Sequence, residues 1–182
     1  MGYDINLVAQ DDKYSSSYLP LIEKLKQRFP EFKNTYCDLD TLEKVYDGRY
    51  GTNNYTKQEI IQKGLSIKLE AEFSDGIPKP REIQKTASGF TVEIRHEDWM
   101  EISFWDNGNI NLEVPNYPYR DLKVAIADIL SVIQFFEKEG FAVDHPVEDK
   151  IILKTDVEAF LYQDYLNRQI QVDKVRKIVF DE

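Results

Sequence analysis

Three segments in which apolar and polar residues alternate constrain the fold of this chain more than any other feature. Their apolar members are Phe90, Val92 and Ile94, then Met100, Ile102 and Phe104, then Ile110, Leu112 and Val114. Side chains in a strand point alternately to its two faces, so each segment has one apolar face. We therefore predict a three-stranded antiparallel meander with one apolar side.

The turn between the last two of these strands decides which residues share a face. A two-residue Asn-Gly turn would put their apolar sets on opposite faces of the sheet. A three-residue loop ending at Gly108 pairs Trp105 with Asn109 and brings Phe104 and Ile110 to the same face. Such a loop needs a residue in the left-handed conformation, which glycine adopts readily. We predict the three-residue loop with its bulge.

The elements on either side of the meander suggest a known arrangement. Short strands are predicted over 3–9 and 141–143, and helices over 18–29, with Ser17 as N-cap, and over 122–136, which has an apolar stripe. The order is strand, helix, insertion, strands, helix, strand. The predicted fold class is α+β: an antiparallel meander sheet with helices packed on one face, on a ferredoxin-like, split βαβ plan.

The chain divides into a main domain over 1–149, with an insertion at 31–88, and a C-terminal helical appendage over 150–182 docked on it. Capping boxes at Thr56–Glu59 and Thr155–Glu158 predict two helix starts.

Within the insertion, alternation over 67–73 predicts a strand. A short helix is predicted over 40–46, and a loop follows it.

Net charge limits the partners of this chain. The formal charge is −10 and the pI about 4.8. Nucleic acids and anionic membranes repel such a protein, so we expect neither as a partner and expect a basic protein instead. The single cysteine, Cys37, excludes an internal disulfide, and no stretch is apolar enough to span a bilayer. A cytoplasmic location is therefore expected.

The sequence contains no residue pattern that is specific for a catalytic site. A metal-dependent enzyme would need His96, Asp98, Asp144 and His145 to meet, and no spacing rule brings them together. Cys37 is followed by an aspartate, which disfavours a reactive thiolate. No cofactor is expected, and the sequence favours a non-enzymatic role.

The polar side of the predicted meander is the candidate binding surface. Its expected members are Thr91, Glu93, Arg95, Glu101, Ser103, Trp105, Asn109, Asn111 and Glu113. Segment 90–114 holds six acidic residues and one basic residue. A tryptophan among carboxylates suits recognition of a basic protein surface. Trp105, Glu101, Glu113 and Asp106 are the predicted partner-binding residues; alternatively, the insertion or the C-terminal helix covers Trp105.

Several turns and strands resemble a known family. The opening Met1–Ile5, the strand 110–115 with the helix after it, and the segment Gly140–Pro146 are similar to small bacterial immunity proteins of polymorphic toxin systems. His145 stands where an aspartate is found in that family. The resemblance covers about half the chain and carries over no catalytic residue. It implies a stoichiometric cytoplasmic binder that neutralises a toxin.

Three hypotheses follow from the sequence. The leading one is a protein-binding domain, most specifically an immunity protein. The second is a metal-dependent enzyme using the histidine and carboxylate set. The third is a structural or oligomeric subunit that self-associates through the C-terminal helix.

Overall fold

The computed structural model describes most of the chain in several stretches. These are residues 2–36, 56–65, 67–72, 82–85, 91–94, 99–105, 108–115, 122–145 and 150–180. The strands are β1 (Gly2–Ala9), β2 (Lys33–Tyr36), β3 (Ile67–Glu72), β4 (Glu82–Lys85), β5 (Thr91–Ile94), β6 (Trp99–Phe104), β7 (Asn109–Pro115) and β8 (Phe141–Val143). The helices are α1 (Leu19–Arg28), α3 (Lys57–Lys63), α4 (Leu122–Lys138) and α5 (Val157–Phe180).

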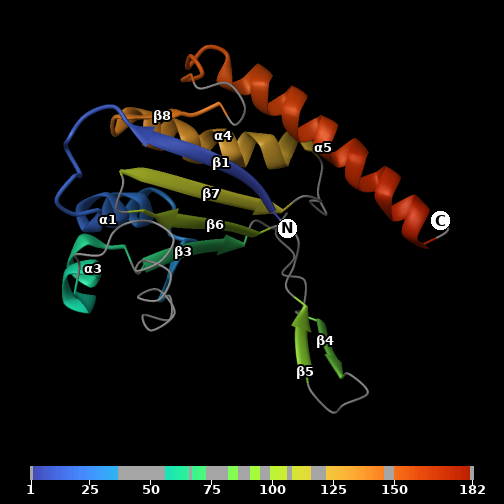
Figure 1. Ribbon diagram of the computed structural model, residues 1–182, viewed down its shortest axis with the longest axis horizontal. Helices are drawn as coiled ribbons and strands as arrows, with labels where there is room; N and C mark the ends of the chain where they lie inside the picture. Colours follow the sequence, from blue (N-terminus) through green and yellow to red (C-terminus); the bar gives the residue numbers. More distant parts are fainter. Residues whose placement is uncertain are drawn as a thin grey trace.

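Six of the strands form one antiparallel sheet in the order β2-β3-β6-β7-β1-β8 (Figure 1). Strand β7 lies between β1 and β6, and β1 lies between β7 and β8. In the unit β1-α1-β6, strand β7 thus lies between the two strands, and in the unit β7-α4-β8, strand β1 does. This interleaving confirms the predicted α+β, ferredoxin-like plan. The insertion adds β3 and β2 beyond β6.

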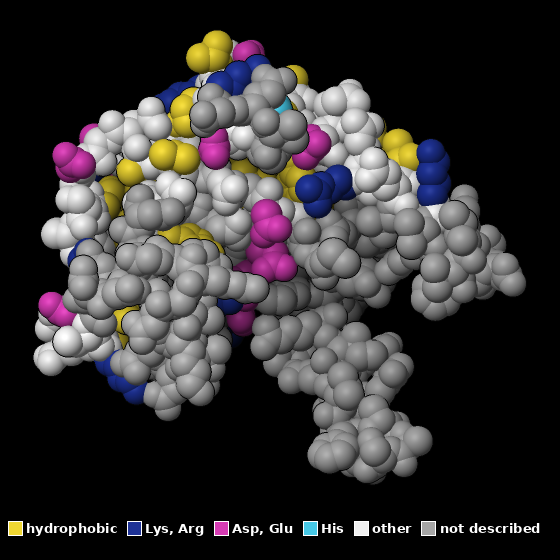
Figure 2. Space-filling view, viewed as in Figure 1, with side chains coloured by type: hydrophobic (Ala, Val, Ile, Leu, Met, Phe, Trp, Pro, Cys, Tyr) yellow, Lys and Arg dark blue, Asp and Glu magenta, His cyan; other side chains and the backbone are white. Residues whose placement is uncertain are grey.

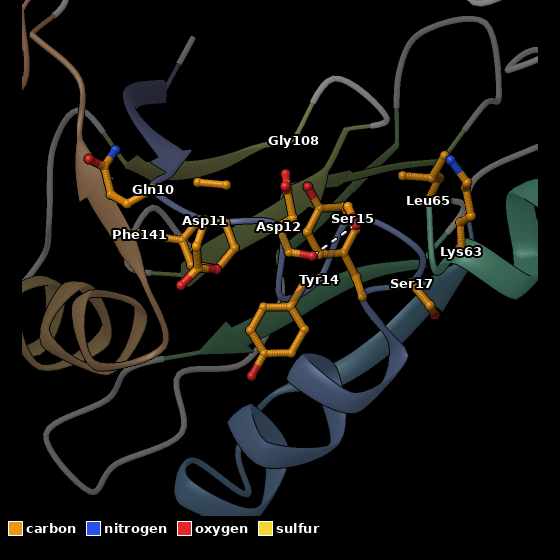
Figure 3. Close-up of a pocket in the computed structure, with 12 residues that line it drawn as sticks. Gln10, Asp11, Asp12, Tyr14, Ser15, Ser17, Lys63, Leu65, Gly108 and Phe141 are labelled. Atoms are coloured by element: carbon orange, nitrogen blue, oxygen red, sulfur yellow. Dashed lines mark hydrogen bonds between the residues drawn. The ribbon is translucent and has the colours of Figure 1, made fainter.

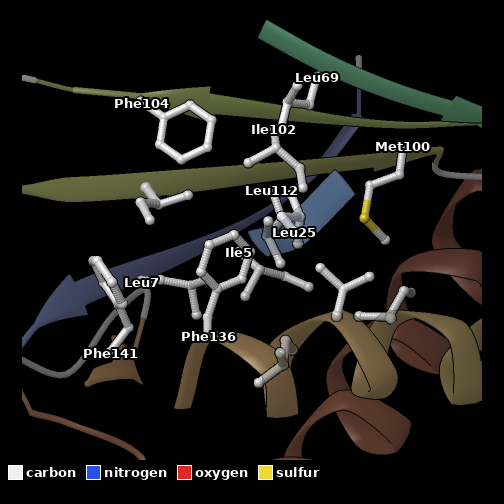
Figure 4. Packing of buried hydrophobic residues seen from close by; sticks show 14 of the residues in the cluster. Ile5, Leu7, Leu25, Leu69, Met100, Ile102, Phe104, Leu112, Phe136 and Phe141 are labelled. Atoms are coloured by element: carbon white, nitrogen blue, oxygen red, sulfur yellow. The ribbon is translucent and has the colours of Figure 1, made fainter. Parts of the chain in front are cut away.

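The core lies between the sheet and the helices. Alternation places Ile5, Ile102 and Leu112 on one face of the sheet, where each is at most 3% exposed. Leu25 of α1 and Phe136 of α4 lie against them and are fully buried (Figure 4). Each such side chain stabilises the fold by roughly 1.5–3 kcal/mol relative to exposure, so this layer holds the sheet and the helices together.

The first strand of the predicted meander does not join this sheet. Strand β5 pairs with β4, with Val92 opposite Gln84, in a separate two-stranded sheet. The neighbour of β6 is instead β3, with Leu69 opposite Ile102. The prediction was wrong here because alternation specifies which face a residue occupies and leaves the partner strand open. Thr91 and Glu93 are therefore not on the main sheet.

The hairpin between β6 and β7 confirms the predicted three-residue loop. Phe104 pairs with Ile110. The Trp105 N–H donates to the Asn109 carbonyl at 3.0 Å, and Gly108 has φ +89°. The left-handed glycine thus keeps the apolar residues of both strands on the core side.

The predicted N-cap residue is correct for α3 and wrong by one position for α1. The capping box at Thr56 forms, with the Glu59 N–H donating to its hydroxyl and the Glu59 carboxylate accepting from the Thr56 N–H. In α1 the N-cap is Tyr18 instead of Ser17. The Ser17 hydroxyl still accepts a hydrogen bond from the Leu19 N–H at 3.2 Å. The short helix predicted over 40–46 lies outside the described residues.

Helix α5 begins at Val157 and runs without a break to Phe180. The residue that directly precedes the helix is therefore Asp156, one position after the Thr155 that the predicted capping box required. The Asp156 carboxylate accepts a hydrogen bond from the Thr155 hydroxyl at 3.1 Å. Leu161 and Tyr165 are buried. The ring of Tyr165 lies 5.0 Å from that of Tyr3, so the first half of α5 packs beside α4 on the core side of the sheet.

Candidate protein-binding face

The sheet face opposite the helices carries a row of carboxylates. Asp4 pairs with Glu113, Glu113 with Glu101, and Glu101 with Glu70, across strands β1, β7, β6 and β3. Lys33 ends the row on β2. Directly opposed residues point to the same face with their Cβ atoms about 4.5–5.5 Å apart. We call Asp4, Glu113, Glu101 and Glu70 the acidic row, and the sheet face that carries it the polar face.

Side chains beside the acidic row partly offset its charge. Lys68 forms an ion pair with Glu101, and the Ser103 hydroxyl lies 3.4 Å from the same carboxylate oxygen. Glu101 is only 9% exposed, whereas Asp4 and Glu113 are exposed. Figure 2 shows acidic side chains gathered near the middle of the displayed face. Glu101 therefore holds Lys68 in place within the face, and Asp4 and Glu113 expose their charges to solvent.

Trp105 lies at the end of β6 and is half-buried. Its backbone is fixed by the hairpin hydrogen bond to Asn109. The described contacts of α5 include α4 and Tyr3, whose side chain lies on the core side of the sheet. Asp106 lies outside the described residues, as do residues 37–55 of the insertion. Of the predicted partner-binding residues, the structure thus brings Glu101 and Glu113 together and places Trp105 directly after the strand that carries Glu101.

The residues of the alternative metal site are only partly described. His96 and Asp98 lie outside the described residues. Asp144 donates its N–H to the Asn6 carbonyl at 2.9 Å, and the His145 ring lies 5.2 Å from that of Phe160. Within the described stretches, no three His, Cys, Asp or Glu residues gather as metal ligands would.

Sequence reasoning missed a cavity of about 440 Å³ at the end of β1 (Figure 3). The loop after β1 contributes Asp11, Asp12 and Ser15 to its lining, Gly108 contributes from the tip of the β6–β7 hairpin, and Phe141 from β8. The sequence shows only a polar loop over 10–16. The paired aspartates, Asp11 and Asp12, shortly after the predicted strand were the one available signal.

A cluster of charges holds this loop to the end of α4. One oxygen of Glu139 accepts hydrogen bonds from Lys13 Nζ at 2.7 Å, from Lys24 Nζ at 2.9 Å and from the Tyr14 hydroxyl. Burial alone would raise the pKa of Glu139. The hydrogen bonds from Lys13, Tyr14 and Lys24 outweigh burial and lower it from 4.5 to about 2. The cluster therefore joins the loop, α1 and α4 at one carboxylate.

None of the described helices combines the length and the apolar character needed to cross a membrane. A comparison of the chain with protein-family models, with curated proteins and with solved structures finds no match.

Proposed function

We propose that this chain is a non-enzymatic protein-binding domain that engages a basic protein through its polar face. The acidic row is the observation that carries the proposal. Like charges directly opposite each other on neighbouring strands destabilise a sheet. A partner that places Lys or Arg against Asp4 and Glu113 relieves this repulsion, so the charges that weaken the free domain strengthen the complex.

The surroundings of the acidic row suit such a complex. Asn6 and Asn111 lie beside it and are joined by a hydrogen bond of 3.1 Å. Their remaining donors and acceptors suit polar contacts at the rim of an interface. Trp105, at one end of β6, is the anchor residue of the proposed interface, because buried tryptophans dominate binding energy in many interfaces. Because strands carry these side chains, little ordering is needed on binding.

The more specific form of the proposal is an immunity protein that neutralises a toxin in the cytoplasm. Its support is the resemblance of residues 1–5 and 140–146 to that family and the net charge of −10. A stoichiometric inhibitor needs no catalytic residue, only a surface complementary to its target. Electrostatic attraction would speed association, which matters when a toxin must be intercepted quickly.

Capture from the lysate of the native host, with three tagged baits, tests the proposal. We expect one stoichiometric basic protein on the wild-type bait. Glu113→Lys should lose it, because the substitution places a cation inside the acidic row. Glu23→Lys makes the same charge change at an exposed position of α1, on the core side of the sheet, and should retain it. Equal capture by the two variants would contradict the polar-face proposal.

A further inference from the structure

The cavity at the end of β1 is bounded by parts of the chain that are distant in sequence. Loop 10–17 forms one wall, Lys63 at the end of α3 and Leu65 after it form another, and Ala9, Gly108 and Phe141 complete the lining. Figure 3 shows Asp11 and Asp12 on the loop wall, with Lys63 and Leu65 on the other side. Its volume, about 440 Å³, lies in the range of sites for small groups.

The loop wall is fixed before any ligand arrives. Gln10 donates its N–H to the Gly140 carbonyl at 2.8 Å, and Asp11 accepts from the Lys13 N–H at 3.0 Å. Glu139 then holds Lys13 and Tyr14 from the opposite side. A wall held at both ends loses little freedom on binding, so the cavity is preorganised.

One carboxylate in this wall is available to a ligand. The Asp12 carbonyl accepts from both the N–H and the hydroxyl of Ser15, at 3.1 and 2.8 Å, which fixes the turn. Within the stretches that the structure describes, the Asp12 carboxylate has no hydrogen bond or ion pair. The aromatic residues Tyr18 and Phe141 also line the cavity. A carboxylate near aromatic rings suits a guanidinium or ammonium group.

We propose that this cavity receives the cationic end of one arginine or lysine side chain from the partner, with Asp12 as its anchor. The inference rests on the proposed function, since the partner is taken to be basic. Gly108 belongs to the hairpin whose strands carry Glu101 and Glu113, so one partner can contact the polar face and reach the cavity. Arginine is the better fit, because its planar group donates to a carboxylate in a bidentate manner.

Nuclear magnetic resonance with a capped Gly-Arg-Gly peptide tests this proposal on the full chain. We expect saturable amide shifts within 10–17 and at Gly108. The Gly-citrulline-Gly peptide, which has the same shape and no charge, should cause none. Asp12→Asn should weaken binding about tenfold, the effect of one charge-assisted hydrogen bond. Glu23→Gln should bind as the wild type does, because Glu23 lies on α1 and does not line the cavity.

The cavity proposal would be overturned by shifts located elsewhere, by equal binding of the citrulline peptide, or by unchanged binding by Asp12→Asn. Putrescine binding more tightly than the arginine peptide would assign the cavity to a free amine and would also overturn it. These failures differ from failure of the proposed function, which is read from the Glu113→Lys and Glu23→Lys baits.

Discussion

Glu101 of β6 and Glu113 of β7 lie directly opposite each other on the polar face of the sheet. Glu70 pairs with Glu101 on its other side, and Asp4 pairs with Glu113. Lys68 forms an ion pair with Glu101 and so offsets only part of this charge. The free domain therefore carries a repulsion that the proposed basic partner would relieve. Its stability and the proposed binding should then respond in opposite directions to the same substitution.

Neutralising one member of the acidic row should stabilise the free domain. Glu113→Gln removes the charge opposed to both Glu101 and Asp4 and keeps the size of the side chain. We expect the free energy of unfolding at pH 7 to rise by about 0.2–1 kcal/mol, measured by urea denaturation. Glu23→Gln on α1 is the matched control and should change it less. A loss of stability in Glu113→Gln would show that repulsion within the row is not significant.

Removing the Glu139 charge should destabilise the protein in a pH-dependent way. The folded-state pKa of about 2 lies below the ordinary value of 4.5, so ionised Glu139 stabilises the fold above pH 4.5. That contribution is lost as the pH falls towards 2. Glu139→Gln should cost on the order of 1–2 kcal/mol at pH 7, and the difference from the wild type should shrink below pH 4.5.

Thermal unfolding of both proteins between pH 7 and pH 2.5 measures this difference. A constant difference across the range would mean that Glu139 acts through its shape instead of its charge. Glu137, two residues earlier in α4, provides a control: burial raises its pKa, so Glu137→Gln should not lose stability at pH 7 in the same way.

Alanine substitutions at two glycines should distinguish the cost of a strained backbone from the cost of a steric clash. Gly108 and Gly140 both have positive φ, +89° and +97°. Among the described residues, a Cβ on Gly108 would meet only the Ala9 Cβ, at 4.0 Å, whereas one on Gly140 would lie 2.8 Å from an Asp11 carboxylate oxygen. Both alanine variants pay about 1–2 kcal/mol for the left-handed backbone. Gly140→Ala should lose more in denaturant titrations, because Asp11 must also move; equal losses would contradict this contact.

Tyr3 connects β1 to α5. Burial, and then a hydrogen bond to Asp164, raises the pKa of the Tyr3 hydroxyl well above its usual range. The guanidinium of Arg168 lies 5.1 Å from the Tyr3 ring centre. Tyr3→Phe should cost about 0.5–1.5 kcal/mol at pH 7 and should make α5 more sensitive to limited proteolysis.

The pH dependence of this variant has a definite sign. Above pH 10 an unfolded chain releases the Tyr3 proton and the folded chain keeps it, so the wild type loses stability there. The Tyr3→Phe variant has no hydroxyl to ionise at this position, so it does not lose stability in this way. The stability gap between the two proteins should therefore narrow as the pH rises above 10, and a gap that widened would contradict the buried, protonated state of Tyr3.

The elements that sequence patterns predicted well are those whose signals are local. The β6–β7 loop followed from the need to keep Phe104 and Ile110 on one face, and the helix after Thr56 followed from its capping box. Strand β2 was missed. Its sequence, Lys33-Asn34-Thr35-Tyr36, has no apolar alternation because it lies at the sheet edge, where strands need fewer buried side chains.

The parts that sequence could not predict depend on contacts between distant segments. The partner of β6 is β3, and nothing in the alternation of either strand specifies that pairing. The burial of Glu101 also comes from its place on a strand between β3 and β7. Only two of the four residues of the acidic row, Glu101 and Glu113, were predicted from the sequence. Asp4 and Glu70 belong to the row because of the register in which β1 pairs with β7 and β3 pairs with β6.

The central claim is tested most directly by the affinity of the purified complex at two salt concentrations. Asp4→Asn with Glu113→Gln neutralises the two exposed members of the acidic row without adding a charge. Calorimetric titration of the captured partner should show a higher Kd for this variant at low salt, and a smaller rise in Kd with added salt than the wild type shows. An unchanged Kd and an unchanged salt dependence would contradict binding through the polar face.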